Sequence, residues 1–263
     1  MSIDQHPDGG EMKRLNIVIP FRDRHQHLSR FVPHVRAYFS RDKLDSKIPY
    51  TVTIVEQQAG LPFNRGALKN IGYLLRKNDS EYTCFHDVDY LPIWADYSWV
   101  DVPTPIVWYG AEERPLTLRP DSPIVKHKLD LFFGGAILVP NGLFFDVNGY
   151  SNEYWGWGYE DSDIQKRFKE KGILFGRRKG TFSPLFHDNE GYNADCTPTT
   201  IASFNERLYK KKWQAANISM SNDGLSNISF EVLEKKLLPK DNFERYAVWE
   251  IVTVKINSTL QDG

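Results

Sequence analysis

Short apolar runs alternate with helically spaced apolar residues through the first third of the chain. Residues 15–20, 50–55 and 82–86 are continuous runs rich in β-branched and aromatic side chains, which predict buried strands. Residues 25–39 and 65–76 carry apolar side chains three or four positions apart, which predicts two amphipathic helices. This alternation of strands and helices predicts an α/β domain.

The pattern becomes less regular beyond residue 90, where prolines divide the chain into shorter pieces. Further elements are predicted as strands at 106–109, 136–139, 225–232 and 245–256, and as a helix from Glu160 to about Gly172. The two alternating segments near the C-terminus favour a mixed, mainly parallel central sheet. Residues 14–256 are predicted to form a single domain, with flexible tails at 1–13 and 257–263.

The composition excludes several classes of protein. With 263 residues, 41% of them hydrophobic and 25% charged, the chain suits one large core and is not of disordered or fibrous composition. A formal net charge of −1 gives no basic surface for nucleic acid. No apolar stretch approaches the ~20 residues that span a bilayer, and the first dozen residues lack a secretory pattern. We therefore expect a cytoplasmic protein, at most peripheral to the inner face of the membrane.

Two carboxylates follow the third predicted strand. Asp87 and Asp89 are two positions apart, a spacing that places both side chains on one side of an extended strand. Ligands of open α/β sheets bind beyond the carboxyl ends of the strands, so this pair is a candidate site for a hard divalent cation and a diphosphate. An Asp-x-Asp pair also occurs by chance in many proteins, but its position here, directly after an apolar strand, favours a metal site. His187 is a candidate imidazole ligand, although a lone histidine is more often a polar cap.

The segment WGWGYEDSD at 155–163 is a second cluster. Alternating Trp and Gly suit neither a helix nor a strand, and they predict a mobile loop that presents indole rings to a ligand. Glu160, Asp161 and Asp163 then begin a helix, where the dipole favours negative charge. These residues are also typical helix caps. A cap needs one carboxylate, however, so three of them beside two tryptophans favour a site.

Basic and aromatic residues follow the first two predicted strands. Phe21, Arg22 and Arg24 come after the first strand, and Phe63 and Arg65 come after the second. Arginine forks suit phosphate oxygens, and a nearby ring can stack on a base. Loops after successive strands meet at one edge of a sheet, so both are expected to face the acidic pair. Solvated arginines on two surface loops are the alternative.

Six segments in this order resemble the β-1,4-galactosyltransferase family, glycosyltransferase family 7, whose members share a GT-A type nucleotide-sugar-binding fold. The segments are PFRDR at 20–24, FNRGALKNIGY at 63–73, DVDYLP at 87–92, FFGG at 132–135, WGWGYEDSD at 155–163 and DGLSNISFEVL at 223–233. They extend over nearly the whole chain. Because six motifs occur in the same order as in the family, a functional role for these residues is favoured over the purely structural interpretation of each motif.

The resemblance implies an inverting, manganese-dependent glycosyltransferase. Its donor would be UDP-galactose or UDP-N-acetylgalactosamine, and its acceptor a sugar or glycolipid glycan that receives a β-1,4 linkage. By family position, Asp89 and His187 would bind Mn²⁺, Asp161 would be the catalytic base, and Glu160 would contact the acceptor sugar beside it. The resemblance implies donor contacts for Phe21, Arg22, Arg24, Phe63, Arg65, Asp87, Phe132, Trp157 and Gly158.

Several features depart from the family pattern. Tyr159 stands where the family has glycine, and Ser162 where it has an acidic residue, which affects the acceptor contacts. Some family members supply a third metal ligand shortly before or after the histidine. Here Pro184 and Asn189 stand in that region, and the third protein ligand is unidentified. Phe132 replaces a tyrosine whose hydroxyl disfavours an N-acetylated donor, so N-acetylgalactosamine is expected to compete with galactose. Animal members are membrane-anchored Golgi enzymes, so this chain resembles a soluble bacterial form that builds surface glycans.

Two other functions remain open from the sequence. A nucleotide-sugar hydrolase would use Asp161 to activate water in place of a sugar hydroxyl. A non-catalytic sugar-binding module would keep the fold without turnover, and the intact acidic motifs argue against it. Products formed with and without an acceptor separate these functions from glycosyl transfer.

Overall fold

The computed structural model describes residues 13–41, 48–107, 132–185, 199–214, 220–240 and 247–257. The strands are β1 (Leu15–Phe21), β2 (Tyr50–Gln57), β3 (Tyr82–His86), β4 (Tyr90–Trp94), β5 (Thr104–Pro105), β6 (Ala136–Pro140), β7 (Thr181–Pro184), β8 (Phe230–Leu237) and β9 (Val248–Ile256). The helices are α1 (His25–Arg41), α2 (Arg65–Arg76), α4 (Asn141–Asp146), α5 (Glu160–Glu170), α6 (Thr200–Gln214) and the short 3-10 helix η3 (Met220–Asn222).

The large sheet has seven strands in the order β5-β6-β3-β1-β2-β9-β8, and β4 pairs with β7 in a separate ribbon. Its centre is parallel, because β1 pairs in parallel with β2 and β3, and β2 with β9. Antiparallel pairing adds β6 and β5 on one side and β8 on the other. The predicted mixed sheet is therefore confirmed. Because β1 and β3 are buried along their whole lengths, their apolar runs are continuous.

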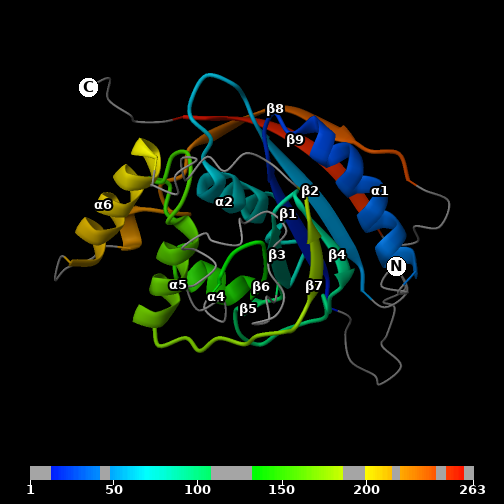
Figure 1. The fold of residues 1–263 in the computed structure, drawn as a ribbon, viewed down its shortest axis with the longest axis horizontal. Helices are drawn as coiled ribbons and strands as arrows, with labels where there is room; N and C mark the ends of the chain where they lie inside the picture. Colours follow the sequence, from blue (N-terminus) through cyan, green and yellow to red (C-terminus); the bar gives the residue numbers. More distant parts are fainter. Residues whose placement is uncertain are drawn as a thin grey trace.

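Helices cover both faces of this sheet (Figure 1). The apolar stripe of α1, which includes Phe31 and Val35, packs in the cluster that contains Ile17 of β1. On the opposite face, Ile71 of α2 packs in the cluster that contains Val18. Adjacent residues of β1 thus point to opposite helical layers, as the alternation of side chains along a strand requires.

Several predicted bounds are corrected by the structure. The strand expected at 225–232 begins only at Phe230, because the residues before it form turns. At 106–109, Val107 forms an isolated bridge with Gly180, the neighbouring strand is β5, and residues 108 and 109 lie outside the described ranges. The sequence did not predict β4, β7, α4 or α6. The helix α6 lacks a strong apolar stripe, since its buried residues are Ala202 and Asn205.

The fold places one end of each central strand at a common edge. The register pairs Phe21 with Glu56 and Val18 with Phe85, so β1, β2 and β3 end close together. The loops that leave these ends carry the basic and acidic motifs. Within the described ranges, no helix is long and apolar enough to cross a membrane. The predicted tails fall almost wholly outside those ranges, so the domain limits stay predictions.

Candidate functional site

The first turn of α2 sets the position of the site. Asn64 caps this helix, because its side-chain oxygen accepts the backbone N–H of Ala67 at 2.9 Å. The backbone N–H of Asn64 in turn donates to the side-chain oxygen of Gln57 at 2.8 Å. The helix therefore starts at a defined point after β2. Arg65 is its first residue, and Lys69 lies one turn later on the same face.

These two cations gather three carboxylates from two other parts of the chain. The Arg65 guanidinium donates to Asp87 Oδ2 at 2.9 Å, forms a close ion pair with Glu160, and lies 3.5 Å from Asp161 Oδ2. Lys69 Nζ donates to Asp161 Oδ1 at 2.9 Å. The end of β3, the start of α2 and the start of α5 thus meet at one acidic cluster, which we call the α2–α5 cluster (Arg65, Lys69, Asp87, Glu160 and Asp161).

Burial and neighbouring positive charges shift the pKa values of these carboxyl groups in opposite directions. Burial raises the pKa of Asp161, but Lys69 and Arg65 outweigh burial, so its pKa lies below the ordinary value. Burial dominates for Glu160 and Asp87 and raises their pKa values despite Arg65. Asp161 is therefore the carboxyl group of the three whose surroundings favour the ionised form, which is the form that a general base requires.

Asp89 lies outside the α2–α5 cluster. Residues 87–89 form a turn after β3, in which the Tyr90 backbone N–H donates to the Asp87 carbonyl oxygen at 3.3 Å. The expectation that Asp87 and Asp89 share one side of an extended strand is therefore wrong. The turn directs Asp87 to Arg65, whereas Asp89 Oδ2 accepts from Arg24 at 3.3 Å.

The donor chemistry of Asp89 fits a hard divalent cation. Its carboxylate is 7% exposed and lies at the carboxyl end of β3, where oxygen ligands can be held in place. His187, the other predicted ligand, lies outside the described residues. Within the described ranges, no group of three His, Cys, Asp or Glu side chains is arranged to hold a metal. Of the two predicted ligands, Asp89 is the one that the described ranges contain.

The basic loop after β1 contacts the loop after β2. The Arg22 guanidinium donates to the Leu61 carbonyl oxygen at 2.6 Å and lies 5.4 Å from the centre of the Phe63 ring. Phe21 differs from its neighbours, because its ring is 1% exposed, belongs to the core and packs edge-on against His25. That position supports the loop and does not present the ring to a ligand.

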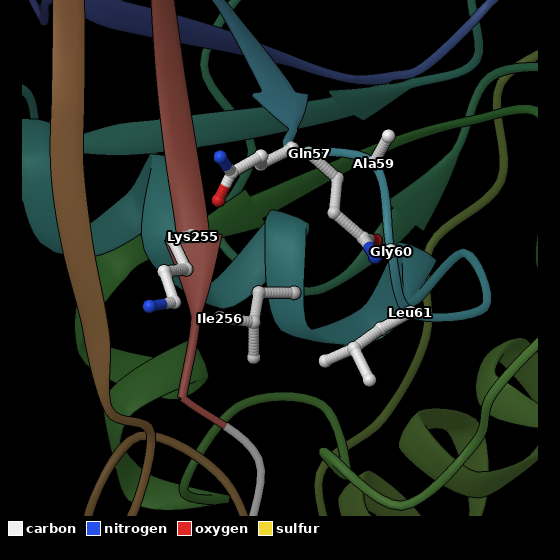
Figure 2. A pocket seen from close by; sticks show the side chains of 7 residues that line it. Gln57, Ala59, Gly60, Leu61, Lys255 and Ile256 are labelled. Carbon is white, nitrogen blue, oxygen red and sulfur yellow. The ribbon is translucent and has the colours of Figure 1, made fainter.

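A cavity of about 200 Å³ adjoins this region. Figure 2 shows it between the loop that carries Gly60 and Leu61 and the end of β9 that carries Lys255 and Ile256. Leu61 links the cavity to Arg22 through the hydrogen bond described above. The cavity lining contains none of the predicted site residues, so it borders the candidate site without including it.

The Trp-Gly segment is irregular, as predicted, and hydrogen bonds hold it from two sides. The Gly156 backbone N–H donates to the Phe63 carbonyl oxygen at 2.7 Å. The side-chain amide of Asn205 on α6 donates to the carbonyl oxygens of Trp155 and Trp157 at 3.0 and 2.9 Å. The segment therefore bridges the loop after β2 and α6.

Two residues at the end of this segment adopt left-handed backbone conformations. Tyr159 has φ of 74° and Gly158 has φ of 95°. The Tyr159 conformation is one that glycine adopts without strain and tyrosine adopts with some. This explains physically why glycine suits the position where Tyr159 departs from the family motif.

Phe132 lies beside the predicted catalytic base. A Cβ atom added to Gly134 would lie 2.5 Å from Asp161 Oδ2 and 3.1 Å from Phe132 Cζ. Both groups therefore pack closely against Gly134, at a point where any larger side chain would clash with them. The Arg177 guanidinium donates to the Phe132 carbonyl oxygen at 2.7 Å and holds the backbone there.

Sequence patterns missed two residues of this region. Lys69 lies among the apolar residues of α2, so the sequence pattern did not single it out. Its spacing of four from Arg65 puts both residues on one face of the helix, which is the signal that would have placed Lys69 beside the acidic residues. Asn205 lies in α6, a helix that the sequence did not predict. The sequence grouped Asp163 with Glu160 and Asp161, but in the structure Asp163 points away from the α2–α5 cluster and pairs with Arg167 at 2.6 Å.

Comparisons with known proteins agree with this geometry. Two family models match, described as the N-terminal region of glycosyl transferase group 7 at residues 5–99 and the N-terminal domain of galactosyltransferase at residues 114–188. β-1,4-Galactosyltransferase 7 of Drosophila melanogaster is 28% identical over 87% of this chain and 66% of its own length. Human β-1,4-galactosyltransferase 4 is 30% identical over 84% of this chain and 60% of its own length. The chain thus spans less than two thirds of these relatives.

Solved structures show the same fold. The catalytic domain of Drosophila β-1,4-galactosyltransferase 7 in complex with xylobiose has a TM-score of 0.70 and 24% identity, covering 95% of this chain and 96% of that one. A mutant of that enzyme, in complex with manganese, UDP-Gal and xylobiose, gives the same values. The predicted GT-A type fold is therefore confirmed.

Proposed function

This chain belongs to the β-1,4-galactosyltransferase family, glycosyltransferase family 7, and on that premise we propose that it transfers galactose from UDP-galactose to an acceptor sugar. A β-1,4 linkage and UDP-N-acetylgalactosamine as a second donor are parts of the same proposal. The observation that carries it is the Asp161 carboxylate in the α2–α5 cluster, which is held by Lys69 and partly exposed, and which lies beside Phe132.

The reaction is a single inverting displacement. The acceptor hydroxyl oxygen attacks the anomeric carbon from the face opposite the diphosphate, and the bond from that carbon to the phosphate oxygen breaks. Asp161 accepts the hydroxyl proton as the attack proceeds, because a free sugar hydroxyl is too weak an acid to ionise beforehand. The Asp161 side chain is 20% exposed, which lets an acceptor reach it. Glu160 is more deeply buried against Arg65 and orients the cluster.

Positive charge near the carboxyl ends of β1 and β2 suits the departing diphosphate. Arg22 and Arg24 lie on the loop after β1, and Phe63 lies under the Arg22 guanidinium. Arginine forks stabilise the charge that develops on phosphate oxygens as the bond breaks. We assign donor binding to this pair, together with Phe63, Arg65 and Asp87. Trp157 and Gly158 would cover the bound donor.

Manganese belongs to the proposal through Asp89. This carboxylate and His187 would hold the ion, which when bound neutralises charge on the diphosphate oxygens. The manganese in the Drosophila relative supports this assignment. Arg24, at 3.3 Å from Asp89, would keep the carboxylate oriented toward the same oxygens.

A matrix of UDP-sugars against acceptor sugars, read by mass spectrometry, tests the function. Each reaction is run with manganese and with a chelator, and with and without acceptor. We expect a disaccharide product that requires both manganese and acceptor. Release of free galactose at the same rate without acceptor would identify a hydrolase, and intact donor in every reaction would indicate a module without turnover.

A further inference from the structure

Lys69 places a buried ammonium group against the proposed base. Its side chain is 2% exposed, and its Nζ atom lies 2.9 Å from Asp161 Oδ1 and 4.6 Å from the centre of the Tyr150 ring. Burial lowers the pKa of Lys69, but Asp161, Tyr150 and Asp87 together outweigh burial, so the pKa is raised. The amine is therefore charged at neutral pH, and its position is defined by a carboxylate on one side and a π face on the other.

The two oxygens of Asp161 have different surroundings. Oδ1 accepts the hydrogen bond from Lys69. Oδ2 is 3.5 Å from the Arg65 guanidinium, a long ion-pair distance, and it packs against Gly134, where an added Cβ would lie 2.5 Å from it. The Asp161 side chain is nevertheless 20% exposed, so a substrate can reach the carboxylate while Lys69 holds it by Oδ1.

We propose that Lys69 is a positioning residue for the transfer reaction, which holds Asp161 by Oδ1 and so keeps its carboxylate in the orientation that meets the hydroxyl of the acceptor sugar. This inference rests on the proposed function, because it assigns Asp161 as the base. Lys69 does not touch substrate in this arrangement. It acts through Asp161 by fixing the rotamer of its carboxylate.

Several charged groups surround Asp161 and bear on its titration. Arg65 and Lys69 approach from α2, Glu160 adjoins it on α5, Asp87 approaches from the end of β3, and Tyr150 lies beneath Lys69. Removing the Lys69 charge leaves Arg65 to balance all three carboxylates. The pKa of Asp161 should then rise, since an opposite charge within about 4 Å typically lowers a carboxyl pKa by about 1–3 units.

Lys69→Met and Lys69→Arg separate positioning from simple packing. Methionine retains the length and apolar stem of lysine, whereas arginine retains its charge. In Lys69→Met we expect kcat to fall by about 10- to 100-fold with a donor KM changed by less than about twofold, as loss of orientation predicts. The acidic limb of the pH profile should move to higher pH by about one unit or more. Lys69→Arg should return that limb toward its wild-type position.

Lys210→Met is the matched control, because Lys210 is 59% exposed and pairs with Glu206 on the surface of α6. It should change neither kcat nor the pH profile. A lower yield of folded Lys69→Met with an unchanged profile would show that Lys69 serves packing alone, and would overturn the inference.

Carboxyl-carbon NMR titration of Asp161 provides a readout that does not depend on activity. We expect the resonance to titrate at higher pH in Lys69→Met than in the wild type, and to return in Lys69→Arg. An unchanged midpoint overturns the inference. Absence of transfer by the wild type, with the midpoint shifted as expected, instead overturns the proposed function and leaves Lys69 controlling a carboxylate of another activity.

Discussion

Asp161 and Asp163 are two residues apart on the first turn of α5, yet they belong to two clusters with different properties. Asp161 lies in the α2–α5 cluster, where three carboxylates share two cations, and its side chain is 20% exposed. Asp163 is fully buried and accepts hydrogen bonds from Tyr154, Trp213 and Arg167. Both of its oxygens are therefore bound by protein.

The second cluster joins three parts of the chain. Arg167 is 1% exposed and donates to Asp163 and to Asp223 at 2.6 and 2.8 Å. Asp223 is also paired with Lys212 of α6. We call these residues the α5–α6 cluster (Asp163, Arg167, Lys212 and Asp223). Its two acidic and two basic residues balance, and it links α5, α6 and the segment after η3.

The contrast teaches how a buried charge can be distinguished as structural or functional. A balanced, fully bonded cluster stabilises the fold only while all its partners are present. An excess of carboxylates that includes a partly exposed one has no such balance, and it suits a site that takes up a proton or a positive charge from a substrate complex. The two clusters should therefore respond to mutation in different ways.

Asp161→Asn should separate the clusters most clearly. The amide keeps the size of the side chain but cannot accept a proton, so turnover should fall by about two to four orders of magnitude while donor affinity is retained. Steady-state kinetics and calorimetry with the donor measure these quantities. Near-normal turnover would leave Asp161 a structural residue like Asp163.

Arg167→Met should instead act on the fold. It leaves Asp163 and Asp223 buried without their shared cation, and removing one partner from a buried ion pair typically destabilises by about 3–5 kcal/mol. Urea unfolding measures the loss. Lys210→Met, which removes an exposed cation from α6, should change the free energy of unfolding by about 0.5 kcal/mol or less. Equal effects in the two variants would refute the structural role of the α5–α6 cluster.

Asp223→Asn should change the pH dependence of stability. Burial raises the pKa of Asp223, but Lys212 and Arg167 outweigh burial, so its native pKa lies below the ordinary 3.8. Its ion pairs therefore contribute stability that is complete above the unfolded pKa and is lost as pH falls through the native one. The variant should be about 1–3 kcal/mol less stable at pH 7, typical of hydrogen bonds to charged groups. Urea titrations should show this deficit shrinking below about pH 3.8; a constant deficit would contradict the assignment.

Phe132→Tyr should produce the smallest effect, a change in donor choice, because Phe132 lies beside Asp161 of the α2–α5 cluster. One added neutral hydrogen bond is worth ~0.5–1.5 kcal/mol, or roughly a two- to tenfold change in discrimination. We expect the wild type to use both UDP-galactose and UDP-N-acetylgalactosamine with a modest preference for galactose, and the variant to favour galactose further. The ratio of kcat/KM for the two donors decides, and an unchanged ratio would remove Phe132 from donor selection.

Particular residues show why the sequence predicted some of this and missed the rest. The bounds of α2 and β3 were predicted correctly, because their periodic and continuous apolar patterns reflect burial directly. The turn at residues 87–89 was missed, since an extended strand and a turn after it have the same two-residue spacing. The helix α6 was missed because much of its contact is polar, through Asn205 and Lys212, and polar contacts leave no periodic signal.

The sequence by itself determined the α/β class, the order of the central elements and the family, because these follow from patterns local to each segment. Only the tertiary structure decided which charges meet. It brought Lys69 to Asp161 across 92 positions of the chain and Arg167 to Asp223 across 56. The physical reason is that apolar periodicity records burial one element at a time, whereas an ion pair between elements depends on how they pack, which no single segment encodes.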